Sequence, residues 1–368
     1  MEWSVKSAME RFRILHEKMK FFILKKIGFL LSVLVGLILF IFFLFQALPG
    51  PEQILSAQRS DAATTKAIVN DLGLDKPLYI QALLYLNDVS PVSFYSIDGT
   101  PAYLNGIKCS LGTKMDLWIK WPYLRTSFNT KRTVTSMLIE AFYGTLILAI
   151  AAMLISMILG VPLGIVAALN RGTWLDKSIV WVSAIGISVP SFFSAMIFSW
   201  LFGYVYQEYT GLSMTGSLFE INELGESRSL KLSNLILPAL ALGIRPLAVF
   251  VQLTRNTIID VLNMDFIRTA KSKGLSESVV IWRHALPNSL NPIITAIGGW
   301  FSSLLAGSFF TEYIFQWKGL GKVTIDAMQQ SDLPLVMGAV LFTACVFFLI
   351  HSATELLYVW IDPRLKNE

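Results

Sequence analysis

The chain has 368 residues, of which 54% are hydrophobic and only 15% are charged. Soluble globular domains carry about 25% charged residues, so this composition excludes an ordinary soluble protein. The net charge of +5 is better explained by basic residues on the cytoplasmic side of a membrane than by a nucleic-acid partner. Cys109 and Cys345 are the only cysteines, and they lie far apart without His or Cys neighbours. This argues against a disulfide framework or a zinc site.

Six segments are long and apolar enough to cross a hydrocarbon core about 30 Å thick. A backbone inside that core must satisfy its own hydrogen bonds, so we predict an all-α integral membrane protein with six transmembrane helices. The predicted helices lie near residues 27–48, 138–159, 179–204, 235–254, 292–311 and 336–360.

Basic residues in the short connections predict the orientation of these helices. On one side they are Lys18, Lys20, Lys25, Lys26, Arg171, Lys177, Arg255, Arg268, Lys271, Lys273, Arg283, Arg364 and Lys366. The other side offers only Arg228, Lys231, Lys318 and Lys322 in its short loops. We therefore predict that both termini are cytoplasmic and that residues 49–134, 207–232 and 312–334 are external.

Five regions follow from this pattern along the chain. They are a cytoplasmic N-terminal extension (1–26), the first transmembrane helix (27–48), a large extracytoplasmic loop (49–134), a transmembrane core (135–362) and a cytoplasmic tail (363–368). The apolar run of the first helix is too long for a signal peptide, and no small-x-small cleavage pattern follows it. It is therefore predicted to be retained.

The connection within 263–287 has the pattern of two short helices. Asn263 or Asp265 can cap the first, and Gly274 stands where a left-handed residue would end it. Ser276 can cap the second, and Pro287 is predicted to stop it. Its apolar residues are Phe266, Ile267, Ala270, Leu275, Val279, Val280 and Trp282. Apolar side chains with basic flanks indicate a docking surface; the alternative is an ordinary basic cytoplasmic loop.

The spacing inside this connection is specific. Ala270 is followed after three residues by Gly274, and nine residues later by His284-Ala285-Leu286-Pro287. This spacing resembles the "EAA" loop of binding-protein-dependent ABC transporter permeases. The stretches RTAKSKGL and RHALPN resemble the oligopeptide/dipeptide branch, although Arg268-Thr269-Ala270 replaces the Glu of the motif. The resemblance implies a loop that docks on a cytoplasmic ATPase through Phe266, Arg268, Thr269, Ala270, Lys273, Gly274, Leu275, His284, Ala285, Leu286, Pro287 and Asn288.

Other stretches resemble the same family. They include LGLDKPLYIQALLYL at 72–86, GVPLGIVAALNRGTWLD at 160–176, SVPSFF at 188–193 and WKGLGKVTIDAMQQSDLPLVMG at 317–338. Residues 87–122 have no counterpart in that pattern. This insert is expected to be either a small hairpin-like cap or a loop without direct function.

The resemblance implies a permease subunit in a bacterial inner membrane that catalyses no reaction itself and forms half of a pathway for peptides or similar small solutes. Its implied partners are a second homologous permease, two cytoplasmic ABC ATPases that use ATP and Mg, and an extracytoplasmic solute-binding protein. The chain has no phosphate loop of its own, because Gly319-Leu320-Gly321-Lys322 lacks the first Gly and the final Ser or Thr of that motif. ATP hydrolysis must therefore come from partners, and no cofactor is expected on this chain.

Ionisable residues within apolar segments are candidates for function. Arg245, His351 and Glu355 are such residues, and Pro190 is predicted to break the third helix. They serve either the solute pathway or the structure. An alternative function is a proton-coupled secondary carrier that uses Arg245, His351 and Glu355, and a third is a membrane scaffold without transport activity.

Overall fold

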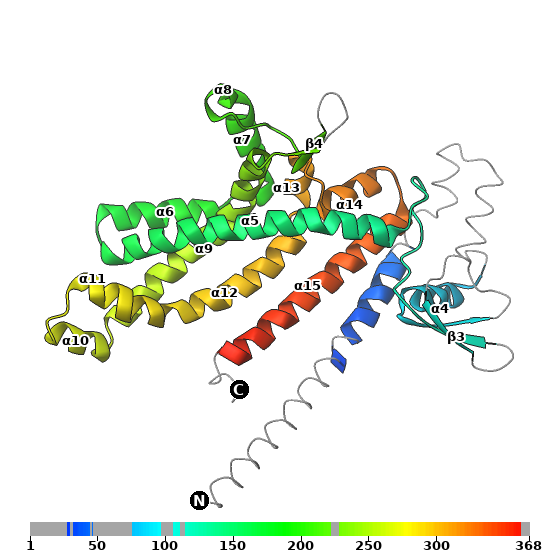
Figure 1. Ribbon diagram of the computed structural model, residues 1–368, viewed down its shortest axis with the longest axis horizontal. Helices are drawn as coiled ribbons and strands as arrows, with labels where there is room; N and C mark the ends of the chain where they lie inside the picture. Colours follow the sequence, from blue (N-terminus) through cyan, green and yellow to red (C-terminus); the bar gives the residue numbers. More distant parts are fainter. Residues whose placement is uncertain are drawn as a thin grey trace, which may run out of the picture. The chain divides into compact units, whose positions relative to one another are not determined.

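The computed structural model describes residues 28–29, 32–44, 46, 76–96, 106–110, 115–221 and 228–361. These residues are mostly helical (Figure 1), and they fall into two compact units. The first unit comprises residues 1–135 and 331–341, and the second comprises residues 136–330 and 342–368. The predicted N-terminal extension, the tail and residues 49–75 lie outside the described part of the chain.

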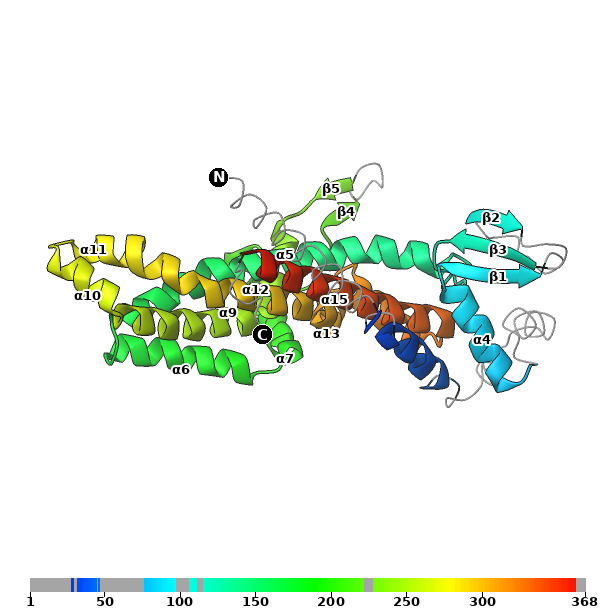
Figure 2. The ribbon, with the colours of Figure 1, turned by 90° about the horizontal axis from the view of Figure 1, so that it is seen from below.

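The first unit contains a helix and a small sheet. Helix α4 spans Leu78–Val89, and strands β1 (Val92–Ser96), β2 (Gly106–Ser110) and β3 (Met115–Lys120) follow it. Figure 2 shows β3 between β1 and β2, and both pairings are antiparallel. Residues 87–122 therefore form more than the expected hairpin-like cap, and the all-α prediction is wrong for this loop. The buried residues of β3 are the polar Asp116 and Lys120, whereas Ile119 is exposed, so the pattern of apolar residues in Met115–Lys120 does not by itself reveal this strand.

A buried polar cluster joins α4 to the sheet. The Lys120 Nζ atom donates to the Asp88 carbonyl oxygen at 2.9 Å and to the Tyr95 hydroxyl at 2.7 Å. The Arg125 guanidinium lies 3.4 Å from the Asp88 carboxylate and 5.2 Å from the centre of the Tyr85 ring. Burial raises the pKa of Asp88 above its ordinary value and raises that of Tyr85 to about 12. The end of β3 is therefore fixed to α4 by the hydrogen bonds of Lys120, and the Asp88 charge is paired with Arg125.

The second unit holds most of the apolar helices. They are α5 (Val134–Leu169, which begins in the first unit), α6 (Trp174–Ser188), α7 (Ser191–Trp200), α9 (Ser233–Leu262), α12 (Leu286–Gly307) and α15 (Leu333–Ile361, which also begins in the first unit). The shorter elements are α8 (Gln207–Thr210), β4 (Phe219–Ile221), β5 (Arg228–Leu230), α10 (Asp265–Ser272), α11 (Glu277–Val279), α13 (Phe309–Ile314) and α14 (Leu320–Gln329). Strands β4 and β5 pair as a hairpin.

Three described helices are long and apolar enough to cross a membrane by themselves. They are α5, α9 and the part of α15 that ends at Thr354. The number rises to five if each of two bent helix pairs forms one span. One pair is α6 with α7, bent by 106° where Val189 and Pro190 take extended backbone conformations. A shorter apolar helix, Ser32–Leu44, covers the described part of the first predicted span. Each of the six predicted segments thus overlaps a described helix, while three to five spans meet the length and composition of a membrane crossing.

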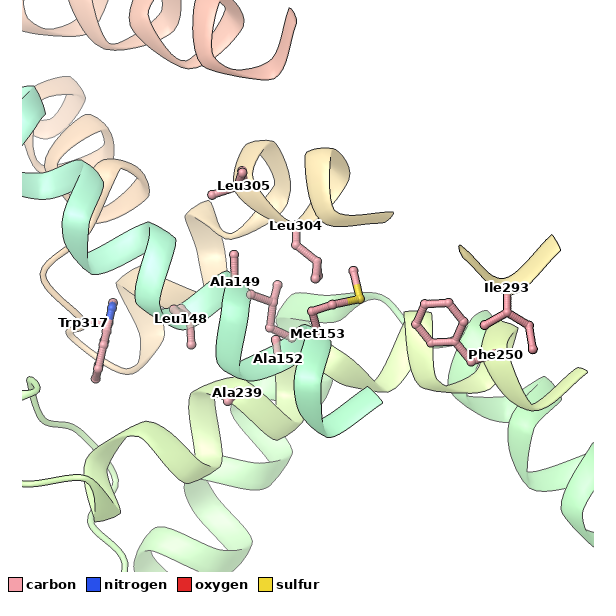
Figure 3. Packing of buried hydrophobic residues seen from close by; sticks show 11 residues of the cluster. Leu148, Ala149, Ala152, Met153, Ala239, Phe250, Ile293, Leu304, Leu305 and Trp317 are labelled. Atoms are coloured by element: carbon pink, nitrogen blue, oxygen red, sulfur yellow. The ribbon is translucent and has the colours of Figure 1, made fainter. Parts of the chain in front are cut away.

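Helix α9 is at the centre of the second unit. In its most apolar stretch 61% of the residues are buried, compared with 33% in α5 and in α15. Figure 3 shows the main apolar core, to which α5 contributes Leu148 and Met153, α9 contributes Phe250, and α12 contributes Ile293 and Leu304. A Cβ atom on Gly243 of α9 would lie 2.8 Å from the Ala152 carbonyl oxygen of α5. The absent side chain therefore lets these two helices pack closely.

Candidate functional site

Helices α10 and α11 form a compact hairpin after α9, here called the 265–285 hairpin. Helix α10 begins at Asp265 and is followed by Lys273, and Gly274 turns the chain with a φ of +76°. The Gly274 amide donates to the Lys271 carbonyl oxygen at 3.0 Å. The predicted left-handed glycine is therefore confirmed, and it ends the helix as glycine commonly does.

The inner side of the hairpin is a small apolar core. Ile267 and Ala270 of α10 pack with Val280 and Ala285, and Val261 of α9 completes the cluster. All five side chains are buried. Two of the expected docking residues, Ala270 and Ala285, thus lie between the helices and hold the hairpin together. Their small size lets the two arms approach closely.

The outer side of the hairpin keeps large apolar side chains in contact with solvent. Phe266 is 39% exposed, Leu275 38%, Val279 36% and Trp282 61%. Lys271, Lys273, Arg268 and Arg283 are also exposed around them. Exposed apolar residues that cluster within one basic element mark a protein-binding surface better than scattered ones do.

Two details of the predicted hairpin are wrong. Neither Asn263 nor Asp265 caps α10: Met264 holds the N-cap position, while the Asn263 amide donates back to the Ile259 carbonyl oxygen at 3.0 Å. Ser276 does hold the N-cap position of α11, but its side chain makes no capping bond.

Pro287 does not stop the second helix. Helix α11 continues through a π-helical turn over Val280–Ala285 directly into α12, where Pro287 occupies the first turn. In the π-helical turn the Leu286 amide donates to the Ile281 carbonyl oxygen, five residues back. The wider turn lies directly before Pro287, which has no backbone N–H to continue the helical hydrogen bonding.

The remaining expected docking residues lie around this junction. Thr269 is exposed, and its hydroxyl donates to the Asp265 carbonyl oxygen at 3.1 Å. Asn288 is exposed, and its amide donates to the carbonyl oxygen of the half-buried His284 at 2.7 Å. Leu286 is half-buried against Ile165, Ala168 and Ile258.

An ion pair that the sequence did not single out anchors α9 just before the hairpin. Arg255 was counted as a basic loop residue, but it lies in α9 and donates to both Asp176 carboxylate oxygens, at 2.6 and 2.8 Å. The Gly172 amide donates to the same carboxylate at 2.9 Å. The Asp176 side chain is only 3% exposed, so this two-point contact ties α6 firmly to α9.

A second unpredicted site surrounds Glu312 of α13. Its Oε1 atom accepts from the hydroxyls of Thr145 and Ser308, both at 2.7 Å. Its Oε2 atom accepts from the amides of Gly321 at 2.7 Å and Lys322 at 3.3 Å. Burial raises the pKa of the Glu312 carboxyl above its ordinary value, and these four donors oppose the rise.

This arrangement explains the glycine-rich fragment at 319–322. Its amides, at the start of α14, receive an internal carboxylate rather than a phosphate. A Cβ atom on Gly319 would collide with the Glu312 carboxylate, so glycine is required there. The rejection of a phosphate loop is consistent with this geometry.

The intramembrane candidates are not brought together into one site. Pro190 lies at the bend between α6 and α7, and Arg245 is exposed in the middle of α9. The His351 ring is exposed and stacks on Phe347 in α15, with 5.9 Å between the ring centres. The side chain of Glu355 lies outside the described residues. Within the described residues, no group of three or more His, Cys, Asp and Glu side chains could hold a metal ion.

Comparison with known proteins decides the family. Residues 160–367 match the model of the binding-protein-dependent transport system inner membrane component, and residues 18–149 match the N-terminal model of such membrane components. The chain belongs to this family. It is a permease subunit of an ABC importer, and this assignment favours the importer over the secondary carrier.

Two bacterial relatives agree with this assignment. The permease is 31% identical to the dipeptide transport system permease protein DppB of Escherichia coli (strain K12), over 94% of this chain and 99% of that one. It is 32% identical to the di/tripeptide transport system permease protein DppB of Pseudomonas aeruginosa (strain UCBPP-PA14), over 94% and 99%. A solved structure of the inward-facing MetNI methionine ABC transporter covers 62% of this chain and 97% of its own, at 13% identity and a TM-score of 0.49.

Proposed function

We propose that the permease forms half of a pathway that carries small peptides across a bacterial inner membrane. The support is the agreement of two relatives over nearly their whole length, both of which are dipeptide or di/tripeptide permeases. The proposed coupling to ATP hydrolysis rests on the exposed apolar side chains on the outer side of the 265–285 hairpin. We assign this surface to a cytoplasmic ABC ATPase, which binds the ATP and Mg that the permease itself does not use.

The proposed topology has six membrane spans with both termini in the cytoplasm. The distribution of Lys and Arg supports it, because the hairpin is rich in basic residues and the turn between α5 and α6 carries Arg171. Residues 49–134, including the three-stranded sheet, then face the extracytoplasmic side. A solute-binding protein delivers the peptide there, and a second homologous permease completes the pathway.

The helical continuity through Pro287 suggests how ATP drives transport. Residues 277–307 form one helical path from the hairpin into α12, bent by 48° between Leu290 and Pro292, so a displacement of the hairpin reaches α12 without an intervening loop. The hairpin core also includes Val261 of α9, so α9 moves with it. Closure of the ATPases would thereby switch the spans between inward-facing and outward-facing states.

Site-directed cross-linking tests this assignment. Single cysteines at Leu275 and Val279, in a background without Cys109 and Cys345, should cross-link to the ATPase in the assembled complex. The matched control is Tyr209→Cys, which replaces another exposed apolar side chain but lies on the proposed external side. Cross-linking from Tyr209→Cys and not from either hairpin position would overturn the assignment.

A further inference from the structure

Arg245 occupies an unusual position on α9. Between Leu237 and Arg255 every other side chain of this helix is buried or half-buried, and Arg245 is the only exposed one. Among the described residues, its side chain has no hydrogen bond or ion pair. A guanidinium at this depth is costly in lipid, so it needs water or an anionic partner.

The face of α9 that carries Arg245 is not the face that packs against α5. Gly243 contacts Ala152 and Ser156 of α5. Arg245 follows two residues later, so its side chain points about 200° around the helix axis from the direction of Gly243. Helices α6 and α12 flank α9 on its two sides (Figures 1 and 2). Arg245 therefore opens into the space between these two helices.

Polar groups continue along the same face. Gln252 lies seven residues after Arg245 and Asn256 eleven residues after it, which places all three within about 20° of one line along the helix. Gln252 is half-buried and Asn256 is exposed. Asn256 lies beyond the predicted span 235–254 and accepts from the Arg255 guanidinium at 3.2 Å, so Gln252 is the second polar side chain of this face at membrane depth. A face turned toward lipid would carry apolar side chains at both positions, so this line is suited to water.

A break in the helical backbone supports the same conclusion independently. A Cβ atom on Gly186 would lie 3.5 Å from the Ala248 Cβ atom and 3.6 Å from the Ile244 side chain, so the end of α6 runs beside this part of α9. The extended residues Val189 and Pro190 follow within one turn, and Pro190 is exposed. Exposed non-helical backbone at membrane depth is tolerated only where it lines a water-filled cavity or meets protein.

We infer that Arg245 lines the solute pathway and binds the C-terminal carboxylate of the peptide during translocation. This inference rests on the proposed function as a peptide permease. A guanidinium binds a carboxylate through two parallel hydrogen bonds, and every linear peptide carries that group whatever its side chains are. One arginine can therefore serve many different peptides, while Gln252 offers an uncharged amide further along the pathway.

The test compares peptide acids with peptide amides in the complete importer. Proteoliposomes containing both permeases, the ATPases and the binding protein receive an equimolar mixture of dipeptides and their C-terminal amides, and mass spectrometry measures the uptake of each. The binding protein is identical in every sample, so its own preference cancels when the acid-to-amide uptake ratio of a variant is divided by that of the wild type.

Arg245→Gln should lower this ratio by about tenfold or more, because a charge-assisted hydrogen bond is lost. Arg245→Lys should keep part of the preference, and Arg132→Gln, which removes an arginine from the proposed external loop, should keep all of it. ATP hydrolysis stimulated by the loaded binding protein should persist in Arg245→Gln.

Three outcomes would overturn the inference, and they can be distinguished. An unchanged ratio in Arg245→Gln, with normal wild-type uptake, excludes a role in carboxylate recognition and leaves the peptide assignment intact. Loss of the second permease during purification of Arg245→Gln shows instead that the arginine joins the subunits. The absence of any peptide uptake by the wild type overturns the peptide assignment together with the inference.

Discussion

The Glu312 carboxylate accepts four hydrogen bonds inside the second unit. The donors are Thr145 of α5, Ser308 just before α13, and Gly321 and Lys322 at the start of α14. A single carboxylate therefore joins three elements. Thr145 also accepts from the Leu320 amide at 2.8 Å, which directs its hydroxyl hydrogen toward Glu312. The sequence could not reveal this site, because Thr145 and Glu312 are 167 positions apart.

Glu312→Gln should destabilise the permease. The NH2 group of a glutamine would replace one carboxylate oxygen and would face hydroxyl or amide groups that donate to Glu312. Those buried donors would then lack an acceptor. We expect a loss of about 1.5–3 kcal/mol, measured as a lower midpoint of thermal unfolding in detergent. Glu208→Gln, at an exposed position in α8, is the control. Equal midpoints for the two variants would show that the Glu312 contacts do not contribute to stability.

Gly274→Val should abolish transport while membrane insertion remains normal. The left-handed backbone at Gly274 disfavours any β-branched residue by about 1 kcal/mol or more, although no atom lies within 4 Å of the added Cβ. The effect therefore comes from the backbone and not from a clash. Gly274→Asn is the matched control, because asparagine tolerates this conformation and should keep most of the uptake. Wild-type uptake by Gly274→Val would mean that the turn is not needed for coupling.

The 265–285 hairpin shows what sequence reasoning captures at the scale of an element. Its two helices and its turn depend on local signals, such as the glycine after Lys273, and these were predicted correctly. The continuation of the helix through Pro287 was not predicted. It depends on the π-helical turn before Pro287, in which Val280 and Ala285 pack against α9 and α10. Residues 87–122 are expected from the sequence to form either a hairpin-like cap or a plain loop, and the three-stranded sheet over residues 92–120 goes beyond both because its strand order depends on non-local pairing.

Leu275→Asp should separate the permease from its ATPase. Burial of one large apolar side chain at an interface contributes about 1.5–3 kcal/mol, and the aspartate adds an unpaired charge to that loss. Co-purification of the ATPase with the tagged permease measures the effect. Ile107→Asp places the same charge on an exposed apolar position of β2 and should leave the ATPase bound. If both variants retain the ATPase equally, the outer side of the hairpin is not the docking surface.

At the scale of the whole molecule, the orientation in the membrane follows from charge alone. We predict that an impermeant thiol reagent labels Tyr209→Cys in intact cells and does not label Ser276→Cys until the cells are opened. Both residues are exposed, and both variants lack Cys109 and Cys345. Labelling of Ser276→Cys from outside would reverse the proposed topology.

The energy source is the central claim of this account, and reconstitution tests it most directly. Proteoliposomes with the complete importer should accumulate dipeptide when ATP is supplied, and His351→Gln should do the same because the His351 ring stacks on Phe347 as part of the helix packing. Proteoliposomes with the purified permease alone should accumulate none, with or without a pH gradient. Uptake by the permease alone in response to a pH gradient would contradict the importer and support the proton-coupled carrier.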